Sequence, residues 1–177
     1  MASTPTRLMT FAEFEQLPDT PQGFPYELRH GELFQVAPPK MEHSRVQRRL
    51  RRLLEDAAGD GAVVDKEVAF RGLPEGEYRV ADVALISTAR WEGAVSYLFG
   101  APELVIEILS PSNTKGEIAE RAKLCLENGS IQFWVADLDR KQVEVLVEGG
   151  RAAYKSGQRI PLFFAEGQTI AVDAIFS

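Results

Sequence analysis

Two acidic residues, each enclosed by an apolar and strand-like run, are the residues of this sequence best suited to chemistry. Asp82 lies within RVADVALIS and Glu107 lies within PELVIEILSPS. Strands with such hydrophobic flanks are largely buried, and an ionised carboxylate is costly to desolvate there unless a metal, a cation or a proton compensates its charge. A pairing with an arginine or with a capped backbone group explains one such acid, whereas two acids on neighbouring strands favour a shared metal site.

The chemistry of these side chains favours magnesium. Because neighbouring strands lie about 5 Å apart, carboxylates at facing positions can bind one divalent ion. Carboxylate oxygens, retained waters and an anionic phosphate substrate suit Mg²⁺ or Mn²⁺, whereas zinc usually takes more His and Cys ligands than the two histidines and one cysteine of this chain supply. The sequence therefore predicts a Mg²⁺ or Mn²⁺ site with Asp82 and Glu107 as ligands.

Two further polar residues are candidates for the same site. Glu27 lies in YELRHGELFQVAP, which is predicted to form a hairpin, and it is either a third metal ligand, a base that orients water, or a surface acid of the hairpin. His43 precedes Val46 by three positions and Leu50 by seven, which places it on the apolar stripe of a helix. It could accept a proton or bind phosphate there, or it could be an ordinary histidine at the edge of the core.

The elements that would position these residues follow from periodicity. Helical spacing predicts a helix from Glu42 to Ala58 and a second one over GEIAERAKLCLENG. The segments GAVVDKEVAF, YRVADVALIS and PELVIEIL read as strands between the two helices, and IQFWVADL follows as a fourth strand. This order predicts an α/β (α+β) fold in which helices pack on a mixed central sheet. A short capped helix at 10–17 and the hairpin precede this core, and a β-rich tail follows it.

Five arginines lie in the first predicted helix, namely Arg45, Arg48, Arg49, Arg51 and Arg52. They mostly occupy faces away from the apolar stripe. They could follow a nucleic-acid backbone, although a run of charge on a helix is more often a solvated face. Asp65, Lys66 and Glu67, in the strand that follows, are expected to face solvent.

Composition limits the setting. The 177 residues are 45% hydrophobic and 26% charged, which predicts one compact domain over 1–177. A net charge of -6 argues against a protein that coats nucleic acid constitutively. Cys125 is the only cysteine, so no intrachain disulfide can form, and the start of the sequence does not resemble a signal peptide. No run is long enough to span a bilayer. A cytoplasmic protein is expected.

Several segments together resemble a known family. YELRHGEL, MEHSRV, ADVAL, VIEILSPSNT and NGSIQFWVAD, in this order, are similar to the Uma-type putative restriction endonuclease family, a branch of the PD-(D/E)XK nuclease superfamily. The resemblance runs roughly from Met9 to the C-terminus. It implies a restriction endonuclease-like fold with an α-β-β-β-α-β core. It also implies that Asp82 is the aspartate of the PD motif and Glu107 the acid of the second half-motif, and Glu27 and His43 match other recurrent polar positions.

The sequence departs from the motif at its cation. Ile108 and Leu109 follow Glu107, so the lysine of the second half-motif is absent from its usual place. Relatives in this branch supply the lysine from the following helix, at the position that Arg121 occupies here. Arg121 shares a helix face with the apolar stripe, whereas Lys123 is rotated by about 200°. Arginine can stabilise developing charge but is a poor proton acceptor. The alternative is a structural ion pair between Arg121 and a site acid.

Two functions remain open from the sequence. The favoured one is a Mg²⁺-dependent endonuclease that hydrolyses phosphodiester bonds in DNA, with Asp82, Glu107, Arg121, Glu27 and His43 at its active site. The alternative is a catalytically weak or inactive nuclease-like module that binds nucleic acid or protein, which the acidic net charge and the missing lysine favour. A homodimer is expected for a nuclease of duplex DNA, because a lone domain cuts one strand per site.

Overall fold

The computed structural model describes residues 7–18, 26–36, 38–72, 75–111 and 113–177. Their elements follow in the order α1 (Phe11–Phe14), β1 (Tyr26–Arg29), β2 (Glu32–Gln35), α2 (Met41–Ala58), the 3₁₀ turn η1 (Gly59–Gly61), β3 (Ala62–Arg71), β4 (Tyr78–Ser87), α3 (Thr88–Gly93), β5 (Leu98–Phe99), β6 (Leu104–Ile108), α4 (Lys115–Glu127), β7 (Gln132–Asp137), β8 (Gln142–Val147), β9 (Gly150–Tyr154), β10 (Arg159–Pro161), β11 (Thr169–Ala171) and α5 (Val172–Phe176).

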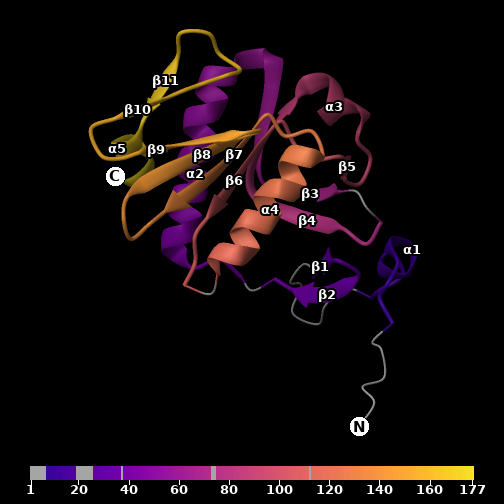
Figure 1. Ribbon diagram of the computed structural model, residues 1–177. Coiled ribbons are helices and arrows are strands. Elements are labelled where there is room, and N and C mark those ends of the chain that lie inside the picture. Colours follow the sequence, from indigo (N-terminus) through magenta and orange to yellow (C-terminus); the bar gives the residue numbers. More distant parts are fainter. Residues whose placement is uncertain (1–6, 19–25, 37, 73–74, 112) are drawn as a thin grey trace.

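A mixed central sheet forms the middle layer, with α2 on one face and α4 on the other (Figure 1). Its strand order is β2-β1-β4-β6-β7-β8-β9, and β3 pairs with β4 and with β5. The pair β6–β7 is parallel, whereas β4 is antiparallel to both β3 and β6. Two apolar clusters cover the two faces: one includes Leu50 of α2 and Ile175 of α5, and the other includes Cys125 of α4 and Phe133 of β7.

The predicted core order is confirmed. It consists of α2, β3, β4, β6, α4 and β7, with the N-terminal hairpin β1–β2 before it and the short strands β8 to β11 after it. The elements α3 and β5, which lie between β4 and β6, and the C-terminal helix α5 are additions that the periodicity did not predict. None of the helices in the described ranges is long and apolar enough to cross a membrane.

Local sequence explains where the helices begin and end. Thr10 and Glu13 form the capping box of α1, and Thr114 and Glu117 form that of α4, so both N-termini have their first amide groups satisfied. The α2 helix buries an apolar stripe at i, i+4 and i+8 and ends at Gly59, whose φ of 54° is a left-handed value that glycine tolerates. A second stripe of α2, composed of His43, Gln47 and Arg51, faces β3 and β4.

Candidate active site

Asp82 lies where the central sheet divides. One end of β4 pairs with β6 and the other end with β1, which meets β4 at the Leu28–Tyr78 pair. The register that pairs Val83 with Ile106, continued by one residue, places Asp82 opposite Glu107, but the ladder ends before this pair. The Asp82 side chain occupies the gap: its Oδ2 accepts a hydrogen bond of 2.7 Å from the backbone amide of Ile108. The two acids singled out in the sequence therefore face each other across an opening in the sheet.

Site side chains also satisfy the backbone of Val80, two residues before Asp82 on β4. The Val80 amide donates to Glu27 Oε1 at 2.8 Å, and the Val80 carbonyl accepts from Arg121 Nη2 at 2.5 Å. Buried backbone groups need partners, and here a carboxylate and a guanidinium replace those of a neighbouring strand. The division of the sheet at β4, between β6 and β1, and the positions of Glu27 and Arg121 thus stabilise each other.

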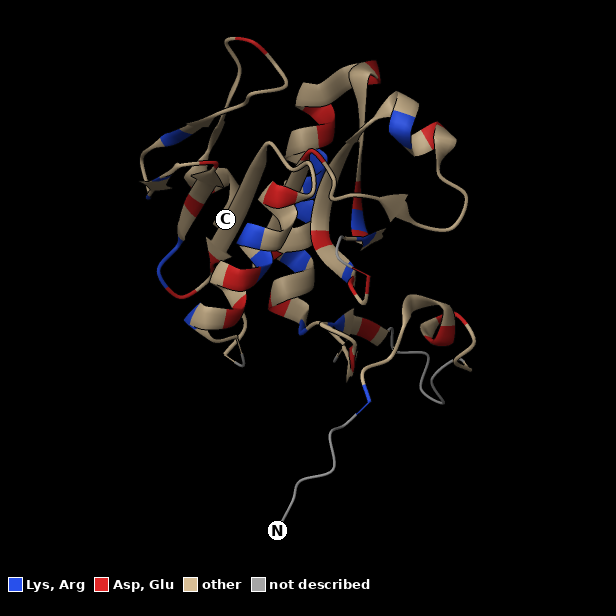
Figure 2. Ribbon diagram, turned by 45° about the vertical axis from the view of Figure 1, so that its right-hand side comes forward, with Lys and Arg blue, Asp and Glu red and all other residues tan. Residues whose placement is uncertain are grey.

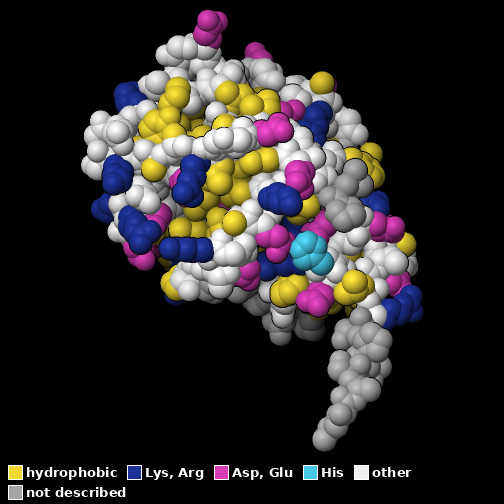
Figure 3. Space-filling model, in the orientation of Figure 1, with side chains coloured by type: hydrophobic (Ala, Val, Ile, Leu, Met, Phe, Trp, Pro, Cys, Tyr) yellow, Lys and Arg dark blue, Asp and Glu magenta, His cyan; other side chains and the backbone are white. Residues whose placement is uncertain are grey.

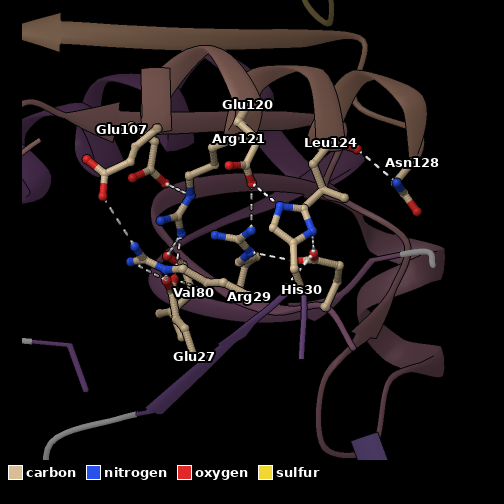
Figure 4. Close-up of polar contacts among 12 residues, drawn as sticks. Glu27, Arg29, His30, Val80, Glu107, Glu120, Arg121, Leu124 and Asn128 are labelled. Carbon is tan, nitrogen blue, oxygen red and sulfur yellow. Dashed lines mark hydrogen bonds and ion pairs between the residues drawn. The ribbon is translucent and has the colours of Figure 1, made fainter. Parts of the chain in front are cut away.

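Arg121 connects two buried acids (Figure 4). Its Nη2 lies 2.7 Å from Glu27 Oε1, and its Nε lies 3.2 Å from Glu107 Oε1. The contact with Glu107 lacks hydrogen-bond alignment, so both of its atoms are buried without a hydrogen bond. Burial alone would lower the pKa of Arg121, but Glu107 and Glu27 raise it above its ordinary value, which keeps the guanidinium charged. The ion pairs that one interpretation of Arg121 expected are therefore present. The other interpretation, stabilisation of developing charge, requires Arg121 to lie at this site, and it does.

Lys123, the other basic residue of this helix segment, points elsewhere. Its side chain is 73% exposed, and Nζ lies 3.8 Å from Glu127 Oε1 on the outer surface of α4. Arg121 is therefore the cation of α4 that reaches the acids.

Glu27 is held by three hydrogen bonds and one further ion-pair contact. Besides the Val80 amide and Arg121, Arg29 contributes Nε at 2.8 Å and Nη2 at 2.7 Å to Oε2. Burial alone would raise the pKa of Glu27, but Arg121, Arg29 and the amide outweigh burial and lower it. Within the described ranges, no three His, Cys, Asp or Glu side chains converge to hold a metal. The carboxylate of Glu27 is thus directed at two arginines, and it is not grouped with Asp82 and Glu107 as a third ligand.

Glu107 is in the opposite electrostatic situation. It is 7% exposed, and burial is the largest of the effects that raise its pKa well above the ordinary value. Asp82 and Glu27 raise it further by repulsion, whereas Arg121 opposes the shift. Arg121 alone therefore does not compensate the charge of an ionised Glu107, and a further cation nearby would stabilise it.

On the face of the sheet that α2 covers, His43 approaches Asp82. His43 Nε2 lies 3.1 Å from Asp82 Oδ1, again without hydrogen-bond alignment. Burial alone would lower the pKa of His43, but the contact with Asp82 and the charges of Asp82 and Glu67 raise it. The structure therefore brings His43 to Asp82, and it brings Arg121 to both Glu27 and Glu107.

Two residues of this region were not predicted as part of the site. Gln47 is 1% exposed, and its Nε2 donates to the backbone carbonyl of Asp82 at 3.2 Å and to the Glu67 carboxylate. Glu67 is exposed, as the sequence predicts, and it also lies opposite Asp82 in the β3–β4 register, where the pair is again absent from the ladder. Its φ of 54° is unusual for a non-glycine residue within a strand. The available clue was the i, i+4 spacing of His43 and Gln47.

A shallow cavity of about 230 Å³ adjoins Arg121 on the α4 side. Arg29, Arg79 and Arg121 line it together with His30, Glu117 and Glu120. The arginines are tied to carboxylates, for example Arg79 Nε to Glu77 Oε2 at 2.8 Å and Arg79 Nη2 to Glu120 Oε1 at 3.2 Å. Figure 3 shows acidic and basic side chains intermixed next to a histidine on this face of the molecule. Arg121 therefore connects the buried acids to an open surface.

The donor set suits a hard divalent cation. Mg²⁺ is commonly held by one or two carboxylates, with waters and substrate phosphate completing its coordination. Asp82 and Glu107 are two such carboxylates in facing positions, and Glu107 Oε1 is a buried oxygen without a hydrogen bond. The excess of acid around Arg121 favours a cation in the same region.

Comparisons with known proteins give one family and one fold. The family model described as Uma2, Putative restriction endonuclease, matches residues 11–176. A crystal structure of a putative nuclease belonging to DUF820 from Anabaena variabilis ATCC 29413 superposes with a TM-score of 0.84, covering 95% of this chain and 97% of that chain, at 22% sequence identity. At this identity the likeness concerns the fold. No curated protein matches the chain.

Proposed function

Since the chain belongs to the Uma2 family of putative restriction endonucleases, we propose that it is a metal-dependent endonuclease that hydrolyses phosphodiester bonds in DNA. Asp82 and Glu107 hold Mg²⁺ or Mn²⁺ in this proposal. The observation that carries it is the break in the β4–β6 ladder, where these two acids face each other and Glu107 has a buried oxygen without a hydrogen bond.

The other residues then have distinct tasks. The bound cation would polarise the scissile phosphate and lower the pKa of a water. Arg121 cannot act as a base, but its guanidinium has five N–H groups, and those that Glu27 and Val80 leave over can stabilise negative charge developing on the phosphate. His43 Nε2, when protonated, steadies Asp82 Oδ1.

Glu27 acts as a positioning residue in this proposal. Its carboxylate accepts hydrogen bonds from the Val80 amide, Arg29 and Arg121, so it holds the Arg121 guanidinium between β1, β4 and β6. The role expected from the sequence, a metal ligand or base, would require Glu27 to leave Arg29 or Arg121.

The proposal is tested first by metal binding. Wild type titrated with Mn²⁺ and Mg²⁺ in a calorimeter should show binding, and Asp82→Asn should lose it, because asparagine keeps an acceptor for the Ile108 amide but not the charge. Asp65→Asn is the matched control, since Asp65 lies on the adjacent strand and pairs at 3.5 Å with Arg51. A wild type that binds neither metal would remove the nuclease proposal.

Arg121→Lys is expected to retain or raise cleavage of plasmid DNA, because lysine is the residue that the motif places there and it preserves the charge. The free energy of unfolding should fall by about 1–2 kcal/mol, because an ammonium cannot reproduce the fork that reaches Glu27, Val80 and Glu107. Gel assays and urea denaturation measure the two effects, and Lys123→Gln serves as control on the exposed face. Complete loss of cleavage in Arg121→Lys would show that the fork geometry is required.

One observation favours a second function. The Arg121 guanidinium already lies against Glu107, and this arrangement suits a catalytically weak module that binds nucleic acid or protein without cleaving it. The metal titration separates the two functions, because the module needs no metal. For the nuclease, a homodimer in the cytoplasm remains our proposal: two sites are needed to cut both strands of a duplex.

A further inference from the structure

The outer face of α2 carries arginines that the active site does not use. Arg45, Arg48 and Arg52 are exposed, and they fall within about 60° of one another around the helix. Val46, Leu50 and Leu54, on the opposite side, are buried against the sheet. We call Arg45, Arg48 and Arg52 the α2 arginine face.

These arginines have no ion-pair partner among the residues that the structure describes. Within the described ranges, no carboxylate lies at ion-pair distance from any of the three, whereas Arg51, one position before Arg52, contacts Glu55 at 3.7 Å and Asp65 at 3.5 Å. The acids of α2 are Glu42, Glu55 and Asp56, which lie beyond the ends of the basic stretch (Figure 2). The protein has a net charge of -6, so a basic surface of this kind is opposite in sign to the charge of the whole chain.

The arginine face belongs to the helix that also reaches the active site. His43, two residues before Arg45, contacts Asp82, and Gln47, one residue before Arg48, donates to the Asp82 carbonyl. From Arg45 to Arg52 the helix rises by about 10 Å, which corresponds to roughly three base steps along a duplex. The arginine face therefore lies on the outward side of the same helix turns whose inward side contacts Asp82.

We propose that the α2 arginine face binds the phosphate backbone of the DNA next to the scissile phosphate. The proposal rests on the proposed function for its choice of DNA, and it adds the surface along which the substrate lies. Arginine suits this task because its guanidinium remains charged and its planar fork matches phosphate oxygens. Backbone contacts of this kind carry affinity and register without reading sequence.

The test measures DNA binding without metal. Fluorescence anisotropy in EDTA compares wild type with the triple variant R45Q/R48Q/R52Q on a labelled DNA duplex over a range of salt concentrations. Losing three phosphate contacts should weaken binding at least about tenfold at low salt and reduce the slope of log K against log salt by about 2–3. Circular dichroism should show an unchanged fold, since all three side chains are exposed.

A matched control removes the same charge elsewhere. R140Q/R151Q/K155Q changes three exposed basic residues around β8 and β9 and should leave affinity and salt slope close to those of wild type. If this control weakens binding as much as the α2 variant, only net charge matters, and the proposal fails. It also fails if R45Q/R48Q/R52Q binds like wild type. An RNA duplex of the same length that binds as tightly as DNA would overturn the assignment to DNA.

This binding test is independent of the metal titration. Loss of affinity in the α2 variant, together with a wild type that binds no metal, would support the arginine face and remove the nuclease. The reverse pair of results would retain the nuclease and remove the arginine face.

Discussion

Glu27→Gln is expected to lower the free energy of unfolding by about 3 kcal/mol, although the two side chains have nearly the same shape. The buried carboxylate of Glu27 faces two arginines and the Val80 amide, and this environment lowers its pKa despite burial. Glutamine removes the charge that compensates Arg29 and Arg121, and its NH₂ group would point a donor at other donors. Urea denaturation at neutral pH measures the loss.

The pH dependence of this difference has a definite sign. Because the folded state lowers the pKa of Glu27 below its ordinary value of 4.5, the stabilisation is present above that pH and disappears as the pH falls through the folded-state value. The difference in the free energy of unfolding between wild type and Glu27→Gln should therefore become smaller at acidic pH. Glu127→Gln is the control: this α4 acid is 63% exposed and its ion pair with Lys123 is long, at 3.8 Å, so we expect a change below about 0.5 kcal/mol. An equal loss in both variants would contradict the role given to Glu27.

The sequence indicated Asp82 and Glu107 as candidate site residues because the apolar residues on either side of each predict that it is buried. The family resemblance indicated Arg121, and its spacing to Ile118 and Cys125 then distinguished its helix face from that of Lys123. The partnership of Arg121 with Glu27 could not be foreseen, because it joins a hairpin and a helix 94 residues apart. The environment of Glu27, and hence its proposed role as an anchor, depends on that long-range contact.

Strand register is another feature of the fold that the sequence patterns did not predict. Periodicity and capping boxes located α2, α4 and the main strands, but neither pattern states which residue of β3 lies opposite Asp82. The identification of Glu67 required the pairs Lys66–Val83 and Val68–Ala81 on either side of it. The helix α3 and the strand β5, with six and two residues, are too short for a period to appear.

Glu107→Gln is expected to have opposite effects on function and on stability. Under the proposed function, the loss of one of two metal-binding carboxylates should reduce DNA cleavage by more than about a hundredfold. The free energy of unfolding should stay unchanged or rise by about 1 kcal/mol, because burial and the neighbouring acids raise the pKa of Glu107 and penalise its charged form. Glu27→Gln, at the other end of Arg121, should instead destabilise the protein, so the two substitutions form a matched pair.

A thermal unfolding series with and without Mg²⁺ separates these effects without relying on cleavage. Metal that binds only the folded protein raises the melting temperature of wild type with concentration, and Glu107→Gln should not respond. If Glu107→Gln is instead less stable than wild type by more than about 1 kcal/mol, the ionised pair with Arg121 supports the fold more than burial opposes it. In that case Glu107 is held chiefly as a structural partner of Arg121, and the second function, a module that does not cleave, becomes the better account of the site.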